Sequence, residues 1–166
     1  MIFLATSVLI LALTAGEGEV YIPDMNFQPD VRQISVPVKV ENVKGVMAIW
    51  LEIDFDPMML EATKILLSDA TKGMISSTNI TDGTVMVAMA GINPIDLDGE
   101  LFKIEFKLTD KMKEGVVTKL KIVKADFNEG AIRVETKDGR ISLGKPSAVV
   151  PKHKRISIWA EMKKAG

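Results

Sequence analysis

The sequence contains no cysteine and a single histidine, His153, which lies near the C-terminus. Without cysteine the chain has no disulfides, no thiolate metal ligands and no thiol nucleophile. One histidine also argues against a histidine-based zinc site or a Ser-His-Asp triad. No glycine-rich phosphate loop follows a predicted strand. These absences point away from the common classes of enzyme, but they do not decide the compartment, because an exported protein can do without disulfides.

The sequence also lacks an excess of one charge, a large aromatic content and any long helical pattern. Its net charge is −1, so bulk electrostatics attracts neither nucleic acid nor an acidic surface. Aromatic residues make up 5%, which predicts an aliphatic core joined by Phe55, Phe102 and Phe106. No segment shows helical periodicity over three turns. The remaining composition, 47% hydrophobic and 26% charged, is that of a folded globular protein.

The two ends differ from the middle. An apolar run from Ile2 to Leu13 is followed by small residues, and it is shorter than a membrane-spanning helix. We therefore expect residues 1–16 to be a signal peptide or a membrane anchor, with a buried helix as the alternative, although no Lys or Arg precedes the run. This predicts an extracellular or cell-surface protein. Residues 145–166 form a basic linker or tail, either solvated or in contact with a partner or membrane surface, and a last short helix or strand there stays open.

Between these ends, residues 17–144 contain short apolar stretches with period-two alternation, separated by turn signals. The turn signals are Pro29-Asp30, Asn42 to Gly45 and Asp82-Gly83. Pro37 indicates an edge strand or a bulge. The predicted strands cover residues 20–25, 32–41, 49–55, 61–68, 73–80, 84–91, 100–108, 118–127 and 139–144. With no alternation of strands and helices, this pattern predicts an all-β sandwich or jelly roll.

The stretch "IWLEIDFDPMMLEA" combines this alternation with an Asp-Pro step. The residue before a proline stays extended, and the Asp56 side chain can accept a backbone N–H two residues later. Asp54 and Asp56 lie about 7 Å apart by strand geometry, a spacing found in inverting glycosidases. The chain has few aromatic platforms for a sugar, however, because Trp50 and Trp159 are its only tryptophans.

A second acidic stretch, "DLDGE", invites a calcium interpretation. It offers only Asp96, Asp98 and Glu100, whereas an EF-hand loop requires oxygen ligands at several fixed spacings. A solvated turn is the alternative, and we favour it.

From about Val20 to Leu143 the chain resembles the cohesin modules of cellulosome scaffolds, which are unrelated to the chromosomal complex of the same name. The resemblance rests on the order and spacing of "VPVKVENVKGVMAIWLEIDFDPMMLEA", "DGTVMVAMAG", "DGELFKIEFKL" and "GRISL". It implies a nine-stranded jelly roll without catalytic activity. It also implies binding of a dockerin, a small calcium-loaded helical module, through a flat sheet face that includes the strands equivalent to residues 46–54 and 84–90.

Strand parity places particular side chains on that face. If Ile49, Leu51 and Ile53 point inward, the neighbouring positions point outward, and the same holds for residues 84–90. The predicted partner-binding residues are Ala48, Trp50, Glu52, Asp54, Met86, Ala88 and Ala90. Trp50 beside small alanines forms an apolar plateau, with Glu52 and Asp54 at its rim, that suits a partner helix. The alternative is that the C-terminal tail covers this face.

The resemblance leaves partner identity and modification open. Many cohesins carry a polar residue where Trp50 stands, so partner specificity does not transfer. We expect no cofactor on this chain, because calcium belongs to the dockerin partner. Asn79-Ile80-Thr81 is a glycosylation sequon that matters only after export, and a glycan on Asn79 would obstruct a partner on the face.

Several other functions remain as alternatives. A carbohydrate-binding module would share the jelly roll but should display a row of exposed aromatics. A structural subunit of a surface layer would polymerise through strand edges, and weak self-association belongs with that alternative. A glycosidase using Asp54 and Asp56 is the most distant option. The leading hypothesis is a module that binds a dockerin-containing protein, binds no nucleic acid, and touches a membrane only through an uncleaved N-terminal segment.

Overall fold

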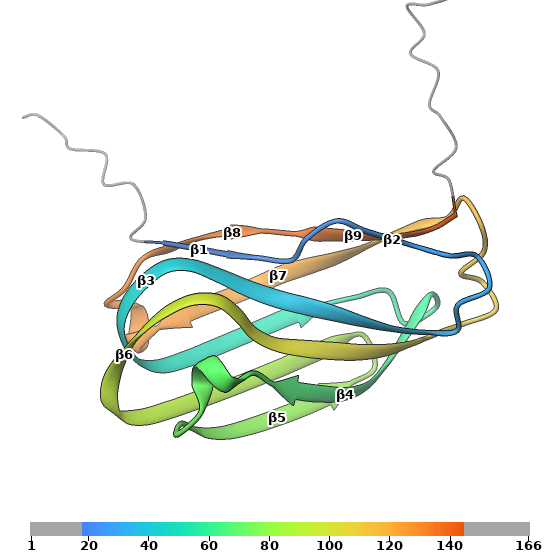
Figure 1. The fold of residues 1–166 in the computed structure, drawn as a ribbon. Coiled ribbons are helices and arrows are strands. Elements are labelled where there is room, and N and C mark those ends of the chain that lie inside the picture. Colours follow the sequence, from blue (N-terminus) through green and yellow to red (C-terminus); the bar gives the residue numbers. More distant parts are fainter. Residues whose placement is uncertain (1–17, 145–166) are drawn as a thin grey trace, which may run out of the picture.

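The computed structural model describes residues 18–144 and is built almost entirely of β-strands (Figure 1). Within that range it contains no α-helix, only the short 3-10 turns η1 (Asp69–Thr71) and η2 (Asn128–Gly130). The strands are β1 (Gly18–Tyr21), β2 (Met25–Phe27), β3 (Gln33–Asp54), β4 (Leu60–Leu67), β5 (Ile75–Thr81), β6 (Thr84–Leu108), β7 (Val117–Phe127), β8 (Val134–Lys137) and β9 (Gly139–Leu143). The predicted all-β, nine-stranded jelly roll is confirmed.

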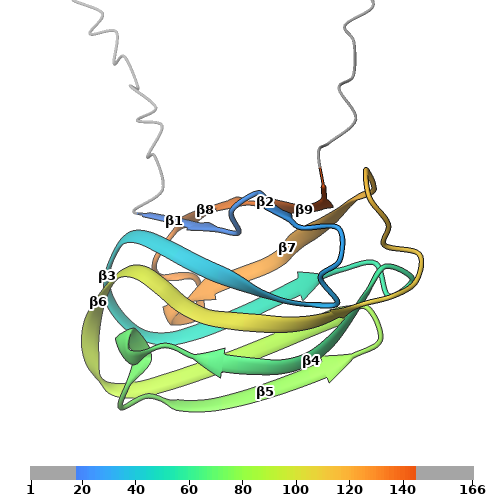
Figure 2. The ribbon, with the colours of Figure 1, turned by 45° about the vertical axis from the view of Figure 1, so that its right-hand side comes forward.

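Two long strands, β3 and β6, build both layers of the sandwich. The first half of β3 pairs with the second half of β6, as in Ile34↔Phe106, and the second half of β3 pairs with the first half of β6, as in Trp50↔Ala88. The first layer has the order β4-β6-β3-β1-β8, and the second has the order β5-β6-β3-β7-β9-β2. Figures 1 and 2 show both strands folding over at the end of the molecule where the layers meet.

The corner in β3 and β6 differs from the sequence prediction. We expected a turn at Asn42–Gly45 and a break between strands at residues 84–91 and 100–108. Instead each segment remains one strand, because β3 and β6 stay paired through the bend, as in Val43↔Leu97. Register shifts and left-handed backbone at Asn42 (φ 55°) and Gly45 (φ 68°) provide the curvature.

The core lies between the two layers and follows the predicted alternation. In β3 every second residue is buried on either side of the corner, and β6 matches it with aliphatic residues and phenylalanines. Phe55 and Phe106 meet edge to face, with ring centroids 5.2 Å apart. Phe102 is fully buried, and Phe127 from β7 joins the core as well. Each such side chain contributes about 1.5–3 kcal/mol relative to an exposed one, so the alternation is the main force holding the layers together.

Pro37 lies where β3 is locally an edge. β1 pairs with β3 only from Lys39 to Glu41, and the register of β3 against β6 shifts between Val38 and Lys39. Both features agree with the prediction of an edge or a bulge, because proline offers no N–H to a second neighbouring strand.

One long side of the sandwich is closed by two parallel strand pairs, β1 with β8 and β2 with β9. The single strand predicted over residues 20–25 is in fact interrupted after Tyr21, and β8 was not predicted. The interruptions allow the chain to pass from the first layer to the second. Gly139 is required there, because a Cβ atom at this position would lie 2.7 Å from the backbone oxygen of Ile22.

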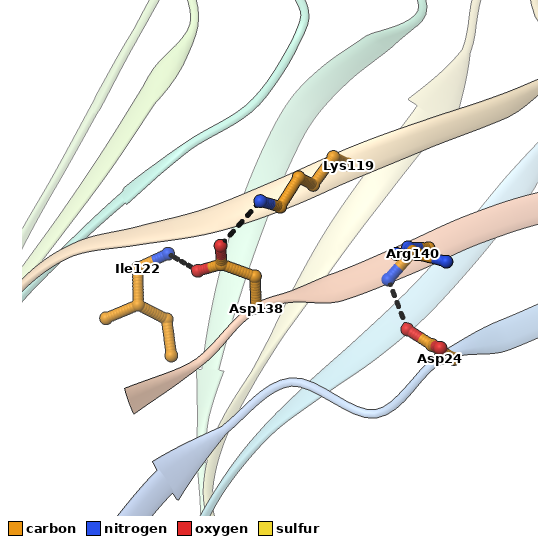
Figure 3. Close-up of polar contacts among 5 residues, drawn as sticks. All are labelled: Asp24, Lys119, Ile122, Asp138 and Arg140. Carbon is orange, nitrogen blue, oxygen red and sulfur yellow. Dashed lines mark hydrogen bonds and ion pairs between the residues drawn. The ribbon is translucent and has the colours of Figure 1, made fainter. Parts of the chain in front are cut away.

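Two aspartates accept hydrogen bonds from backbone N–H groups where the chain passes between the layers (Figure 3). Asp24 Oδ1 accepts the N–H of Arg140 at 2.8 Å. Asp138 Oδ1 accepts the N–H of Ile122 at 2.9 Å, and its Oδ2 lies 2.8 Å from Lys119 Nζ. Burial alone would raise the pKa of Asp138, but the hydrogen bonds from Lys119 and Ile122 and the charges of Lys119 and Lys121 outweigh it, so its pKa lies below the ordinary value.

We expect Asp138→Ala to lower the free energy of unfolding by about 1–3 kcal/mol, because the N–H of Ile122 loses its acceptor. Asp138→Asn keeps an acceptor and should cost less. The native carboxylate binds fewer protons than the unfolded one, so its contribution is present above the ordinary pKa of 3.8 and is lost as the pH falls below it. Urea unfolding at pH 7 and pH 3 should therefore show a larger acid loss in the wild type than in Asp138→Asn. Equal acid losses would contradict this role.

Candidate functional site: the outer face of the second layer

Four strands of the second layer, β5, β6, β3 and β7, carry an open outer face. Their register arranges the outward side chains in rows that run across the strands. From the corner toward the opposite end, the rows are Ile75–Ala90–Ala48, Ser77–Ala88–Trp50–Asp126, Asn79–Met86–Glu52–Lys124 and Thr81–Thr84–Asp54–Lys121. We call this surface the row face.

All of the predicted partner-binding residues lie together on the row face. Ile49, Leu51 and Ile53 are buried, and the residues between them point outward, as parity predicts. The paired strand behaves in the same way, with Val85, Val87 and Met89 buried. Geometry therefore places Ala48, Trp50, Glu52, Asp54, Met86, Ala88 and Ala90 on one surface, and their role in binding stays a prediction.

Trp50 is the central feature of the row face. Its side chain is 44% exposed, although β3 is an interior strand with a neighbour on each side. The small Ala88 lies directly across from it on β6, and Lys124 Nζ lies 5.3 Å from the centroid of its ring. Shallow hollows adjoin Trp50 toward Asp126 and toward Ser77. The Trp50 side chain therefore lies between two shallow hollows, and it can be contacted from both sides.

Polarity changes along the row face. At the corner end, the exposed apolar residues Met47, Ile75 and Ile92 lie near the alanines, with Ile75 82% exposed. At the other end, Glu52 pairs in register with Lys124, and Asp54 pairs with Lys121. Lysines and acidic residues thus lie side by side at this end, because β7 adds lysines beside the acidic residues of β3. Asp126 and Glu129 lie nearer the corner, beside Trp50 and Ala48.

Sequence reasoning missed the contribution of β7. Lys124 and Asp126 point outward because Phe127 in the same strand is buried, and Glu129 follows in η2 with left-handed backbone (φ 56°). The alternation in "VKADF" carried the signal, but only the three-dimensional order of strands shows that β7 lies beside β3.

Asn128 holds the corner end of the face. Its Oδ1 accepts the N–H groups of Met47 (2.8 Å) and Ala48 (2.9 Å), and its Nδ2 donates to the carbonyl of Gly45 (2.9 Å). Asn128 itself has left-handed backbone, with φ 51°, which Asn tolerates better than most residues. One side chain therefore ties η2 to β3 where the bend ends and the row face begins.

The acidic residues considered for catalysis or calcium have structural partners. Asp54 Oδ1 accepts the hydroxyl of Thr84 at 2.8 Å, and Asp56 Oδ1 accepts the N–H of Met58 at 2.9 Å, which confirms the predicted Asp-Pro turn. In the calcium candidate, Asp96 Oδ1 accepts the N–H of Gly45, and Glu100 pairs with Lys103. Over residues 18–144, no three His, Asp or Glu side chains gather into a metal site.

The remaining predicted features divide between the face and the chain ends. Asn79 is exposed on β5, across from Met86, so the sequon does lie on the row face, while its glycosylation stays a prediction. The predicted signal peptide or anchor (1–16), the basic tail (145–166) and His153 fall outside the described residues. None of the helices in the described part of the chain is long and apolar enough to cross a membrane.

The fold and this face define the chain as a jelly-roll module with an open, partly apolar sheet surface. Its sequence matches the family model described as "Cohesin domain" over residues 22–143. The chain belongs to the cohesin domain family. No match was found among curated protein sequences.

Solved cohesin structures share the fold at low identity. A non-cellulosomal cohesin from the hyperthermophilic archaeon Archaeoglobus fulgidus has a TM-score of 0.67 and 23% identity, covering 78% of this chain and 92% of that one. The OlpA cohesin of a type I cohesin–dockerin complex from Clostridium thermocellum has a TM-score of 0.65 and 19% identity, covering 76% and 99%. The third ScaC cohesin of Acetivibrio cellulolyticus, solved with the ScaB dockerin, has a TM-score of 0.66 and 21% identity, covering 77% and 99%.

We expect Asn128→Ala to lower the free energy of unfolding by about 1–3 kcal/mol, because the Met47 and Ala48 N–H groups lose their common acceptor. Backbone strain adds to this, since alanine adopts left-handed backbone less readily. Asn128→Asp is the matched control, because it keeps the acceptor and loses only the donor to Gly45. Hydrogen exchange of the Met47 and Ala48 amides provides the local measurement. If the exchange of these two amides is unchanged in Asn128→Ala, the predicted role of Asn128 in holding β3 is wrong.

Proposed function

We propose that this protein is a non-catalytic binding module that docks a dockerin-type partner on the row face. The exposure of Trp50 in the middle of an interior strand is the observation that carries this proposal. A large aromatic side chain in that position is half in water, although the same strand buries most of its other hydrophobic residues. Aromatic anchors of this kind dominate the binding energy of many interfaces.

The surroundings of Trp50 suit a helical partner. Ala48, Ala88 and Ala90 leave the sheet surface low beside the ring, so a helix backbone can come close. The lysines and acidic residues at the opposite end can fix the orientation of the partner through paired charges. In two of the three solved structures described above, a cohesin is bound to a dockerin, which supports the same class of partner here.

The proposal extends to location and cofactors. Export by the N-terminal segment would place the module outside the cell or at its surface, with membrane contact only if that segment remains attached. Calcium would reside on the dockerin partner and not on this chain. The fold similarity to a non-cellulosomal cohesin is consistent with a partner that is not a cellulase.

We expect Trp50→Ala to weaken binding to a cognate dockerin by more than about 2 kcal/mol, because the anchor of the apolar surface is removed. The measurement is calorimetric titration of the full chain against the dockerin modules encoded in the same genome, with and without calcium. Leu67→Ala is the control, since Leu67 is 42% exposed on β4 in the other layer and should leave the affinity unchanged.

The proposal predicts that binding requires calcium and that Trp50→Ala weakens it. Absence of binding to every dockerin would overturn the function while leaving the fold intact. Binding that Trp50→Ala does not affect would instead move the contact away from the row face.

A further inference from the structure

One edge of the second layer lacks the features that usually prevent a strand from pairing with another chain. β5 pairs with β6 along one side, and no described strand lies beyond it in Figure 1 or Figure 2. Its seven residues, "ISSTNIT", include no charged residue and no proline, and they pair with β6 without a register shift. A regular, uncharged edge of this kind is a template for another strand.

The other edges of the two layers, formed by β4, β8 and β2, are protected. β4 carries Glu61 and Lys64, and its register against β6 shifts between Ala62 and Lys64. β8 has four residues, of which Glu135 and Lys137 are charged, and β2 has only three residues. Charges, irregular register and short length each disfavour pairing with another chain. Among the described strands, β5 is therefore the edge that is left open.

The hairpin between β5 and β6 determines which backbone groups of β5 are free. Its loop is Asp82-Gly83, so the flanking Thr81 and Thr84 form a hydrogen-bonded pair. Hydrogen-bonded and non-hydrogen-bonded pairs alternate along an antiparallel ladder. Every second residue from Ser76 to Ile80 therefore directs its N–H and C=O groups away from β6, toward the open edge.

We propose that β5 pairs with the β5 strand of a second copy of this chain, antiparallel and about a two-fold axis at Thr78. This register aligns all seven residues of each strand and joins the free backbone groups of Ser76, Thr78 and Ile80 to those of the copy. Thr78 then lies across from Thr78 of the copy, and Ser76 lies across from Ile80. The second layers of the two copies form one continuous sheet, with both row faces on the same side.

The side chains favour a second copy as the occupant of this edge. Pairing an uncharged strand with itself places no like charges across from each other. Ile75, which is 82% exposed, is covered in part by Thr81 of the copy. At each end of the paired strands, Asp82 of one copy approaches the segment of the other that contains Lys72, so the flanking charges are opposite. A copy also supplies a strand that is already ordered, whereas a flexible peptide first loses conformational entropy.

This dimerisation goes beyond the proposed function and does not depend on it. The Thr78 side chain lies on the opposite side of β5 from Ser77 and Asn79, which belong to the row face. Variants of Thr78 therefore test the open edge without altering the residues proposed to bind a dockerin, and no dockerin is needed for the measurement.

Charge variants at the two-fold axis provide the first test. Two seven-residue strands form a small interface, so we expect a weak, concentration-dependent dimer of the full chain in sedimentation velocity. Thr78→Lys and Thr78→Glu place like charges across the axis, and each should weaken dimerisation at least tenfold. An equimolar mixture of the two variants should dimerise at least as well as the wild type, because opposite charges then meet.

Ser35→Lys is the matched control, since it adds a charge at an exposed position of β3 in the other layer and should dimerise like the wild type. A chain that is monomeric at every concentration would overturn the inference. So would a dimer that Thr78→Lys leaves unchanged, or a mixture that dimerises no better than either variant alone.

The absence of cysteine allows a direct test of the register. Thr78→Cys introduces the only thiol of the full chain, and the same thiol of the copy lies directly across, where Cα atoms about 5.5 Å apart suit a disulfide. Ser76→Cys is the matched control, because the register separates its two thiols by about 13 Å along the strands. Mild oxidation should crosslink Thr78→Cys at least tenfold faster than Ser76→Cys. Equal rates, or faster crosslinking of Ser76→Cys, would overturn the two-fold pairing at Thr78.

Discussion

Continuous pairing of β3 with β6 through the corner is the constraint on which the rest of the structure depends. Because the two strands bend together, each supplies neighbouring halves to both layers, and the hydrogen-bond ladder continues from one layer to the other. The same pairing sets the register on the second layer, where Trp50 is placed across from Ala88 and Glu52 across from Met86. A slip of one residue would turn Trp50 inward and expose the buried isoleucines. Core and row face are therefore specified by the same register.

The pairing of β3 with its neighbours also makes the row face rigid. β3 is held by β6 on one side and by β7 on the other, and its inward residues are packed in the core. Asn128 fixes the backbone at the corner end, where the bend meets the flat part of the sheet. Outward side chains on such a strand keep their relative positions, so little backbone ordering is required when a partner docks.

Much of the fold and part of the face could be predicted from local pattern. Alternation in residues 49–55 and 84–91 identified the inward and outward side chains, and the Asp56-Pro57 turn followed from the chemistry of two residues. The corner could not be predicted in this way. Asn42 and Gly45 are ordinary turn residues, and only the pairing of β3 with β6 across the bend keeps the strand continuous. Lys124, Asp126 and Asn128 were missed for a related reason, since their importance comes from the strand beside them.

Two carboxylates beside β7 differ in their hydrogen bonding. Asp138 lies against this strand on the closed side of the sandwich, where it accepts the N–H of Ile122 and pairs with Lys119. Asp126 belongs to the same strand, yet its buried oxygen accepts no hydrogen bond although Lys124 is two residues away. The chain thus satisfies a carboxylate where the requirement is structural. On the row face it leaves Asp126 Oδ1 buried without an internal hydrogen bond beside the exposed Trp50, which lowers local stability.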